Sequence, residues 1–198
     1  MSLVVAILAG GAGRRIGGDK PRRLLGGARL LDRVLAKAQA IGSPVILVVR
    51  EPGQVAGFDG TVVQDAPGVA GPLGGLASAL AWAADAGADQ VLTLPCDMPF
   101  LPADLHPRPA LALREESGAA VAASGGRLHP VCALWRTTLA APLAQRAGEG
   151  RLSLRGLGEA VGWVVVDWPT DRGDPFRNID TAEDLVSAEA ALLTPRTR

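Results

Sequence analysis

The chain has 198 residues, of which 48% are hydrophobic and 20% are charged, a composition typical of a single globular domain spanning 1–198. Twenty basic and twenty acidic residues cancel, so no overall charge attracts the protein to nucleic acid or to an acidic membrane surface. Only four tryptophans and three phenylalanines are present, with no tyrosine, which argues against a stacking platform for single-stranded nucleic acid. We therefore expect no nucleic-acid partner.

Two features of the sequence favour a cytoplasmic protein. Cys96 and Cys132 form neither a dense disulfide framework nor a metal-binding spacing with histidine. The apolar start of the chain has no basic residue before it, unlike a signal peptide, and no apolar run approaches the roughly 20 residues that span a bilayer. We expect no export and no membrane association.

Short apolar runs alternate with segments of helical periodicity along the chain. The pattern predicts strands at 3–8, 45–49, 62–63, 91–94, 119–123, 131–135 and 163–166, and helices at 30–41, from about 75 to 87, and from 180 onward. In the last helix, Asp180 is the expected N-cap and Glu183 its capping-box partner. Such alternation is typical of βαβ units, so we expect an α/β fold with a largely parallel sheet, mixed in its second half.

A glycine-rich segment directly follows the first strand. Gly10, Gly11 and Gly13 would let the backbone approach a phosphate, and Arg15 and Lys20 add positive charge. Residues 14–29 hold six basic residues and one acid, an excess of five positive charges that suits a triphosphate. The alternative is a flexible surface turn with solvated arginines.

Two known glycine motifs do not fit this segment. Gly11, Gly13 and Gly17 give G-x-G-x-x-x-G, whereas the dinucleotide fingerprint is G-x-G-x-x-G. The P-loop requires Ser or Thr after its lysine, but Pro21 follows Lys20.

Asp97 follows the strand at 91–94 and lies between Pro95 and Pro99, which restrict the backbone. A single fixed carboxylate at a strand end suits Mg²⁺, with Mn²⁺ as an alternative ion, because Mg²⁺ in phosphate sites takes one or two protein oxygens. The competing interpretation is a turn aspartate that bonds its own backbone. Neighbouring Cys96 is expected to be a buried small side chain rather than a nucleophile.

Weaker candidates occur in other expected loops. Asp65 and the loop 71–75, with Gly75, lie where a nucleoside could dock. His129 is either a contact to an acceptor phosphate or a structural hydrogen-bond partner. Arg177 and Asn178 are either acceptor contacts or the lead into the last helix.

Taken together, these segments resemble the molybdenum cofactor guanylyltransferases. The resemblance extends from residue 3 to about residue 190 and rests on a combination of short motifs: Leu8-Ala-Gly-Gly, Arg15-Ile-Gly, Asp19-Lys20, Gly71-Pro-Leu, Pro95-Cys-Asp-Met-Pro-Phe, His129-Pro130 and Asn178-Ile-Asp-Thr-Ala-Glu-Asp-Leu. It implies a three-layer α/β/α, Rossmann-like nucleotidyltransferase. It also implies the transfer of GMP from GTP to the phosphate of molybdopterin, with release of pyrophosphate.

The resemblance further assigns roles to individual residues. Leu8, Ala9 and Gly10, with Gly11, would line the nucleotide, Lys20 would bind it, Asp65 would contact the nucleoside and Asp97 would hold Mg²⁺. It also implies that the product passes to molybdoenzymes or their chaperones. An ionised acceptor phosphate needs no general base, so the lack of a Ser-His-Asp or Cys-His pattern is expected.

The chain departs from the family pattern at several positions. The family usually has Met at Ile16, often Ser at Gly13, Pro at Ala182, and Asn where this chain has Asp180; an Asn sometimes found after the second strand is not matched at 48–50. The negative charge of Asp180 keeps two alternatives open, a cytidylyltransferase acting on molybdopterin and a nucleotidyltransferase with another small phosphorylated acceptor. A third alternative, from a different class, is a non-catalytic nucleotide-binding protein, against which the presence of both Lys20 and Asp97 argues.

Overall fold

The computed structural model describes residues 1–11, 18–55 and 57–193. Seven strands form one sheet in the order β5-β4-β1-β6-β8-β7-β9, and a small hairpin, β2-β3, lies apart from it. The strands of the large sheet are β1 (Leu3–Leu8), β4 (Val45–Val49), β5 (Thr61–Gln64), β6 (Gln90–Pro95), β7 (Ala119–Ser124), β8 (Arg127–Arg136) and β9 (Trp163–Trp168). The hairpin strands are β2 (Leu24–Leu25) and β3 (Ala28–Arg29). Every strand that the sequence predicts is present.

Six α-helices accompany these strands in the described part of the chain. They are α1 (Leu30–Gln39), α2 (Pro72–Asp85), α3 (Pro107–Ala112), α4 (Ala140–Gly148), α5 (Leu154–Val161) and α6 (Ala182–Leu193). The sequence pattern predicted α1, α2 and α6 but not α3, α4 or α5, which are only six to nine residues long. Such short helices leave too few turns for a clear 3.6-residue period.

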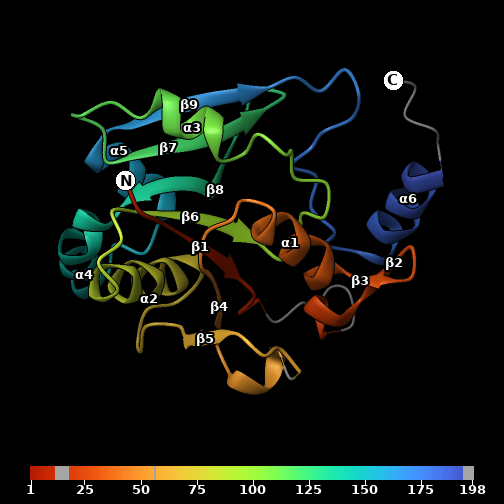
Figure 1. Cartoon of the computed structure of the whole chain (residues 1–198), viewed down its shortest axis with the longest axis horizontal. Helices are drawn as coiled ribbons and strands as arrows, with labels where there is room; N and C mark the ends of the chain where they lie inside the picture. The colour runs from red at the N-terminus through yellow and green to blue at the C-terminus, as the bar shows by residue number, and fades with distance from the viewer. Residues whose placement is uncertain (12–17, 56, 194–198) are drawn as a thin grey trace.

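The sheet is mostly parallel: all its strands except β8 run in the same direction, so their carboxyl ends lie on one side of the molecule. β1 pairs in parallel with both β4 and β6, and β7 pairs in parallel with β9. β8 is antiparallel to its neighbours β6 and β7. Figure 1 shows the parallel strands directed toward the side where β2, β3 and α6 lie. The expected mixed sheet is confirmed.

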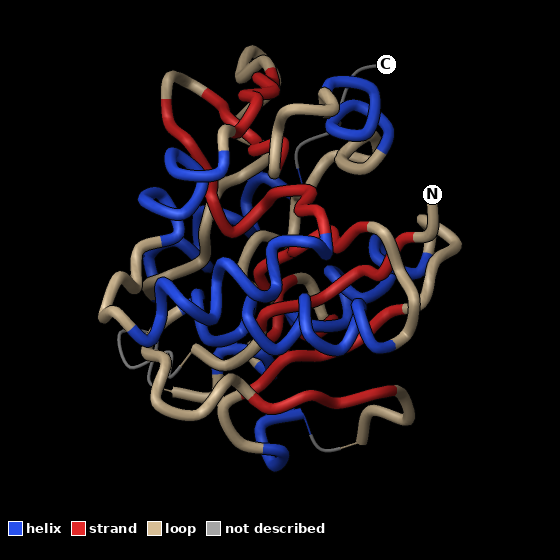
Figure 2. The backbone as a smooth tube through the Cα atoms, turned by 90° about the vertical axis from the view of Figure 1, so that its left-hand side faces the viewer, coloured by secondary structure: helices blue, strands red, loops and turns tan. Residues whose placement is uncertain are grey.

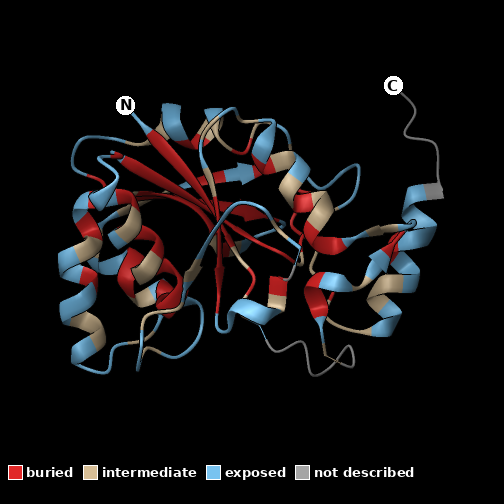
Figure 3. Ribbon diagram, turned by 60° about the horizontal axis from the view of Figure 1, so that its bottom comes forward, coloured by how far each residue is buried: buried red, intermediate tan, exposed pale blue. Residues whose placement is uncertain are grey.

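Helices cover both faces of the sheet, as the backbone trace in Figure 2 shows. Alternate side chains of β1 divide between two hydrophobic clusters. Val5 and Ile7 pack on one face with α1, and Val4 and Ala6 pack on the other with α2, α4 and α5. The inner strands are therefore buried from both sides, whereas the outer strands β5 and β9 and the outer faces of the helices are partly exposed (Figure 3). The three-layer α/β/α fold is confirmed.

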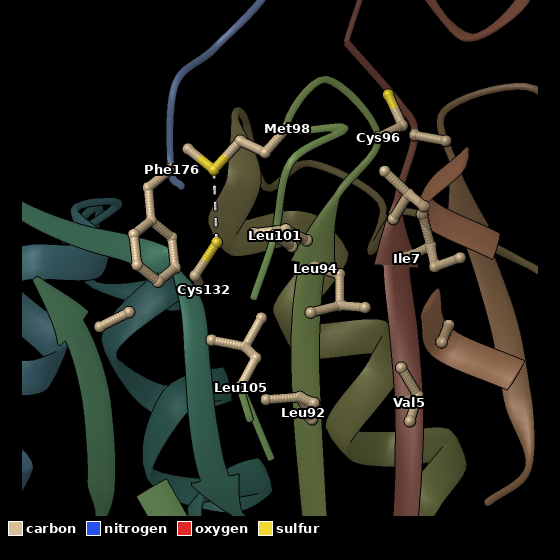
Figure 4. Close-up of a cluster of buried hydrophobic side chains, with 14 of the residues drawn as sticks. Val5, Ile7, Leu92, Leu94, Cys96, Met98, Leu101, Leu105, Cys132 and Phe176 are labelled. Carbon is tan, nitrogen blue, oxygen red and sulfur yellow. Dashed lines mark hydrogen bonds between the residues drawn. The ribbon is translucent and has the colours of Figure 1, made fainter. Parts of the chain in front are cut away.

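The first cluster extends to the edge where the parallel strands end. Figure 4 shows Cys96 at the end of β6, and Met98 beside Cys132 and Phe176. The sulfur atoms of Cys132 and Met98 are 3.4 Å apart. Burial raises the pKa of the Cys96 thiol to about 12, so it is not ionised near neutral pH. This agrees with the interpretation of Cys96 as a packing residue.

The hairpin between β7 and β8 explains the Gly125-Gly126 pair. Ser124 pairs with Arg127, and both intervening glycines have positive φ, 53° and 75°, as a two-residue turn of this type requires. Further along, the register advances by one residue on β7, from 121 to 122, but by four on β8, from 133 back to 129. Pro130 falls within this bulge, where its missing N–H breaks no ladder.

One predicted boundary is wrong. The sequence pattern placed 67–75 in a loop, but α2 begins at Pro72, so Gly74 and Gly75 belong to its first turn. Proline is well suited to the first helical position because its φ is already helical. A Cβ on Gly74 would overlap with the carbonyl oxygen of Val69, so glycine is needed here for close approach rather than for a loop.

A small third cluster connects an early part of the chain, around β2 and the start of α1, with the region of α6. Leu25 and Leu30 bury their side chains against Ile179 and Ala188, with Phe100 and Leu185 packed around them. This cluster fixes the hairpin β2-β3 and helix α6 next to each other. It thereby brings the segment before β2 close to the segment before α6.

No helix in the described ranges is both long and apolar enough to cross a membrane.

The packing of α5 yields a stability prediction. A Cβ on Gly158 would overlap with the ring of Trp163, so we expect Gly158→Ala to lower the free energy of unfolding by about 1–3 kcal/mol. Gly156, in the same helix, has only ordinary contacts around its Cβ position. Gly156→Ala should therefore be neutral or stabilising by up to about 1 kcal/mol. Urea denaturation of both variants measures the difference, and equal stabilities would contradict the packing argument.

Candidate active site

The candidate site lies at the carboxyl ends of β1, β4, β5 and β6. The chain passes from β1 through α1 to β4 on one side, and later returns through α2 to β6 on the other side of β1. Ligands of open parallel sheets bind at such a switch point, in the crevice beyond the strand ends. Leu8 pairs with Pro95 at this point, so the glycine segment and Asp97 both begin there.

The backbone after β1 continues in an extended path between its neighbours. The N–H of Ala9 donates to the carbonyl of Val48 at 2.7 Å, and the N–H of Cys96 donates to the carbonyl of Leu8 at 3.2 Å. A Cβ on Gly10 would lie 2.9 Å from Oδ2 of Asp65 and 3.0 Å from the backbone N of Arg50. Gly10 therefore permits a close contact with the Asp65 carboxylate. None of the described residues has an atom within 4 Å of the Cβ position of Gly11.

Asp65 connects this segment to the start of α2. Its Oδ1 would be 3.4 Å from a Cβ on Gly75, so Gly10, Asp65 and Gly75 lie together in the structure. Burial raises the pKa of Asp65, and the positive charge of Arg50 lowers it by a smaller amount. Its carboxylate makes no hydrogen bond with the described residues. Arg50, Asp65 and the turn 66–71 line a cleft of about 550 Å³, large enough for part of a nucleotide.

Lys20 is the buried charge of the site. It begins a 3₁₀ turn after Asp19, which has the left-handed φ of 51° that aspartate tolerates. Its Nζ lies 2.7 Å from Oδ2 of Asp97 and 2.5 Å from Oδ1 of Asp180, and its side chain is only 9% exposed. Burial alone would lower the pKa of Lys20, but the two carboxylates outweigh burial and raise it. Lys20 is therefore a permanent cation at neutral pH.

Asp97 has one engaged oxygen and one without a partner. Oδ2 accepts from Lys20, whereas Oδ1 is buried and has no hydrogen-bond partner among the described residues. The backbone carbonyl of Asp97 accepts from the N–H of Ile179 at 2.9 Å, which fixes the residue. A buried carboxylate oxygen without a partner is costly unless a ligand satisfies it, and a hard divalent cation prefers such an oxygen. The residues present thus fit a magnesium ion, although the described residues contain no cluster of three or more acidic, His or Cys ligands.

Asp180 is the site residue that the sequence analysis missed. It was expected to cap the last helix with Glu183, but the cap is Thr181, whose Oγ1 accepts from the N–H of Asp184. The carboxylate of Asp184 in turn accepts from the N–H groups of Asp180 and Thr181. These caps leave the Asp180 side chain free to bind Lys20. The departure from the family asparagine at this position was the available signal.

His129 lies in a polar group at the end of the β7-β8 hairpin. The hydroxyl of Ser124 donates to Asp174 at 2.7 Å and lies 2.8 Å from Nε2 of His129, so Nε2 carries the proton in this arrangement. The ring of His129 also stacks on Phe176, with centroids 4.8 Å apart. Burial lowers the pKa of His129. Its contacts are with Ser124 and Phe176 rather than with Lys20 or Asp97.

The other expected acceptor residues lie next to Asp180 in the chain. Arg177 donates through Nη2 to the carbonyl of Asp184 at 2.9 Å and so braces the start of α6. The side-chain oxygen of Asn178 is buried and has no hydrogen-bond partner in the described part of the chain. Arg15 lies outside the described residues. The structure therefore forms one group around Asp65, a second around Lys20 and Asp97, and keeps Asn178 near the second through Ile179.

Comparisons with known proteins identify the family. A sequence profile described as "MobA-like NTP transferase domain" matches residues 5–162. The chain belongs to this family. A molybdenum cofactor guanylyltransferase of Cereibacter sphaeroides is 40% identical over 197 residues, covering 97% of this chain and 98% of the relative. A protein of the same name from Bradyrhizobium sp. is 38% identical and covers 92% of this chain and 90% of its own length.

Solved structures agree with the fold of these MobA-like transferases. Molybdopterin-guanine dinucleotide biosynthesis protein A from Archaeoglobus fulgidus has a TM-score of 0.77 at 23% identity, covering 96% of this chain and 98% of its own. A 2-C-methyl-D-erythritol 4-phosphate cytidylyltransferase from Thermus thermophilus has a TM-score of 0.67 at 22% identity, covering 96% of this chain and 98% of its own. Together with the named relatives, the family identifies the protein as a nucleotidyltransferase.

The partly buried carboxylate of Asp65 leads to a prediction in which stability and binding change in opposite directions. The fold disfavours its ionised form, because burial raises its pKa. At neutral pH, Asp65→Asn should therefore raise the free energy of unfolding, by about 0.5 kcal/mol or less since solvent screens a half-exposed group. The same change should weaken nucleotide binding about tenfold through loss of a charged acceptor.

Thermal denaturation and nucleotide titration measure the two effects. The stability gain should shrink as the pH falls toward the ordinary pKa of an aspartate, because Asp65 is then protonated in both the folded and unfolded states. Asp85→Asn, at the exposed end of α2, is the control and should change neither quantity. A loss of stability in Asp65→Asn at neutral pH would contradict the burial argument.

Proposed function

We propose that the protein transfers GMP from GTP to the phosphate of molybdopterin, which forms molybdopterin guanine dinucleotide and releases pyrophosphate. The full-length similarity to relatives named molybdenum cofactor guanylyltransferase supports this substrate pair. The observation that carries the mechanism is the Asp97 carboxylate, paired to Lys20 through one oxygen and unpaired at the other, at the strand end beside the glycine segment. Such a site acts on phosphates through charge and alignment.

The nucleotide would occupy the crevice that begins at the end of β1. Leu8, Ala9, Gly10 and Gly11 would line it, and the nucleoside would extend toward Asp65 and Gly75. Close approach is supported by the missing side chain at Gly10 and by the lack of described atoms around the Cβ position of Gly11. Asp65, with an unengaged carboxylate beside the cleft, would accept hydrogen bonds from the nucleoside.

Lys20 and the cation would carry the charge of the reaction. The Lys20 ammonium would contact the triphosphate, and Asp97 would hold Mg²⁺, or Mn²⁺ in its place, through its unpaired Oδ1. The bound cation would supply neutralisation of the phosphate oxygens as negative charge shifts to the departing pyrophosphate. No general base is required, because the acceptor phosphate is already ionised at neutral pH. Arg15, in the same glycine segment, would add a second positive charge.

The acceptor phosphate would approach from the side of the chain that precedes α6. Asn178 supports this placement, because its buried side-chain oxygen lacks a partner and its neighbour Ile179 is bonded to Asp97. Arg177 adds a positive charge next to it. His129 is a weaker candidate, since it is engaged with Ser124. The dinucleotide product would pass to molybdoenzymes or to their chaperones.

A substitution at Asp97 tests the cation assignment. We expect Asp97→Asn to lower the rate of pyrophosphate release from GTP and molybdopterin at least a hundredfold, because a neutral amide holds Mg²⁺ poorly. Asp89→Asn is the matched control, since Asp89 precedes the opposite end of the same strand and its carboxylate accepts hydrogen bonds from Ser2. It should retain turnover. Full activity in Asp97→Asn would contradict the role of Asp97.

Removal of divalent ions tests the chemistry independently of any substitution. With EDTA in excess we expect pyrophosphate release to fall at least a hundredfold, and added Mg²⁺ or Mn²⁺ should restore it. The same assay with CTP in place of GTP tests the base preference, and GTP should give the higher kcat/KM. Turnover that persists in EDTA would overturn the metal-dependent mechanism, and a preference for CTP would overturn the guanylyl assignment.

A further inference from the structure

The second carboxylate on Lys20 has no place in the mechanism described above. Asp180 reaches Lys20 from the start of α6, 160 residues away in the sequence, and its Oδ1 lies 2.5 Å from Nζ. Two of the three ammonium protons of Lys20 are thereby bonded to protein carboxylates, one to Asp97 and one to Asp180. A phosphate that is to bind Lys20 through more than one proton must displace one of them.

The charges of this group oppose the binding of an anion. Within the described structure, Lys20 contributes one positive charge and its two partners contribute two negative charges, so the group has one excess negative charge. A triphosphate that approaches the group meets repulsion at short range, where screening by salt is weakest. A divalent cation would reverse the sign of this charge, and the loss of one carboxylate would neutralise it.

Asp180 is the partner that can be displaced at lower cost. Its side chain is 35% exposed, compared with 20% for Asp97 and 9% for Lys20, so its carboxylate can regain water when it leaves the ammonium. Its backbone does not need to move far, because Thr181 and Asp184 cap α6 and Ile179 remains in the small third cluster. These contacts would therefore hold the segment in place when the ion pair between Asp180 and Lys20 opens.

We infer that Asp180 is a positioning residue that competes with the triphosphate for Lys20 and thereby makes nucleotide binding depend on the divalent cation. This inference rests on the proposed role of Lys20 in binding the triphosphate. Without the cation, Asp180 retains Lys20 and GTP binds weakly. With the cation present, the excess negative charge is neutralised, Asp180 releases Lys20 to the phosphate, and GTP binds tightly.

The test is calorimetric titration of the full chain with GTP alone, in EDTA and again in Mg²⁺, at constant ionic strength. We expect Asp180→Asn to tighten binding in EDTA about threefold to tenfold, because the amide cannot neutralise Lys20. Asp180→Glu, which keeps the charge, should bind like the natural sequence. Asp32→Asn removes an acid from an exposed pair with Arg29 and is the control for overall charge. It should leave the affinity unchanged.

A double-mutant cycle with Lys20 separates this inference from the proposed function. In Lys20→Met, GTP should bind more weakly, and adding Asp180→Asn to that variant should give no gain in EDTA. If Lys20→Met weakens binding but Asp180→Asn does not tighten it in EDTA, the competition is disproved while the role of Lys20 stands. If Lys20→Met binds GTP normally, both fail.

Two other results would also overturn the inference. An equal gain from Asp180→Asn with and without Lys20 would mean that only the general negative charge matters. Asp180→Asn could also reduce the dependence of GTP affinity on Mg²⁺ solely by weakening GTP binding in Mg²⁺. That result would mean that Asp180 acts on the cation and not on Lys20. Either outcome is distinguishable from the competition by the affinity in EDTA.

Discussion

The burial of one ammonium group organises the functional edge of this sheet. Lys20 is almost fully removed from water, and a buried charge is stable only when opposite charges and hydrogen bonds compensate for lost hydration. Asp97 and Asp180 provide that compensation from elements 77 and 160 residues away. The end of β6 and the start of α6 must therefore lie next to the segment that follows β1. The small third cluster meets this requirement by packing Ile179 against Leu25 and Leu30.

The nucleotide half of the site depends on close approach rather than on charge. Gly10 and Gly75 leave room for the Asp65 carboxylate between the ends of β1 and β5 and the start of α2. Gly74 lets α2 begin against the carbonyl of Val69. The result is a partly buried acid with no hydrogen-bond partner in the described structure, at a cost in stability that its raised pKa reflects. A group that destabilises the fold but faces a cleft is typical of a binding site.

The sequence predicted the strands and the longer helices for identifiable reasons, and it placed several of the candidate site residues just after strands. β1 is an unbroken apolar run and β6 is mostly apolar because both faces of a central parallel strand are buried, and glycine and Asp97 follow these strands at their carboxyl ends, as expected. The start of α2 was misplaced because two glycines and a proline resemble a loop until the contact with Val69 is known. The capping role given to Asp180 failed because Thr181 and Asp184 form an equally good cap one residue later.

By itself, the sequence determined the layered α/β fold, the order of its strands along the chain, the position of Asp65 and Asp97 just after strands, and the place of Lys20 in the segment that follows the first strand. These follow from local periodicity and from glycine and proline, which act over a few residues. Only the tertiary structure decided which charges meet. The pairing of Lys20 with Asp180, and the engagement of His129 with Ser124 and Phe176, depend on contacts between distant segments. Such contacts are set by packing across the whole core, because no local pattern specifies which of several exposed acids will neutralise a buried cation.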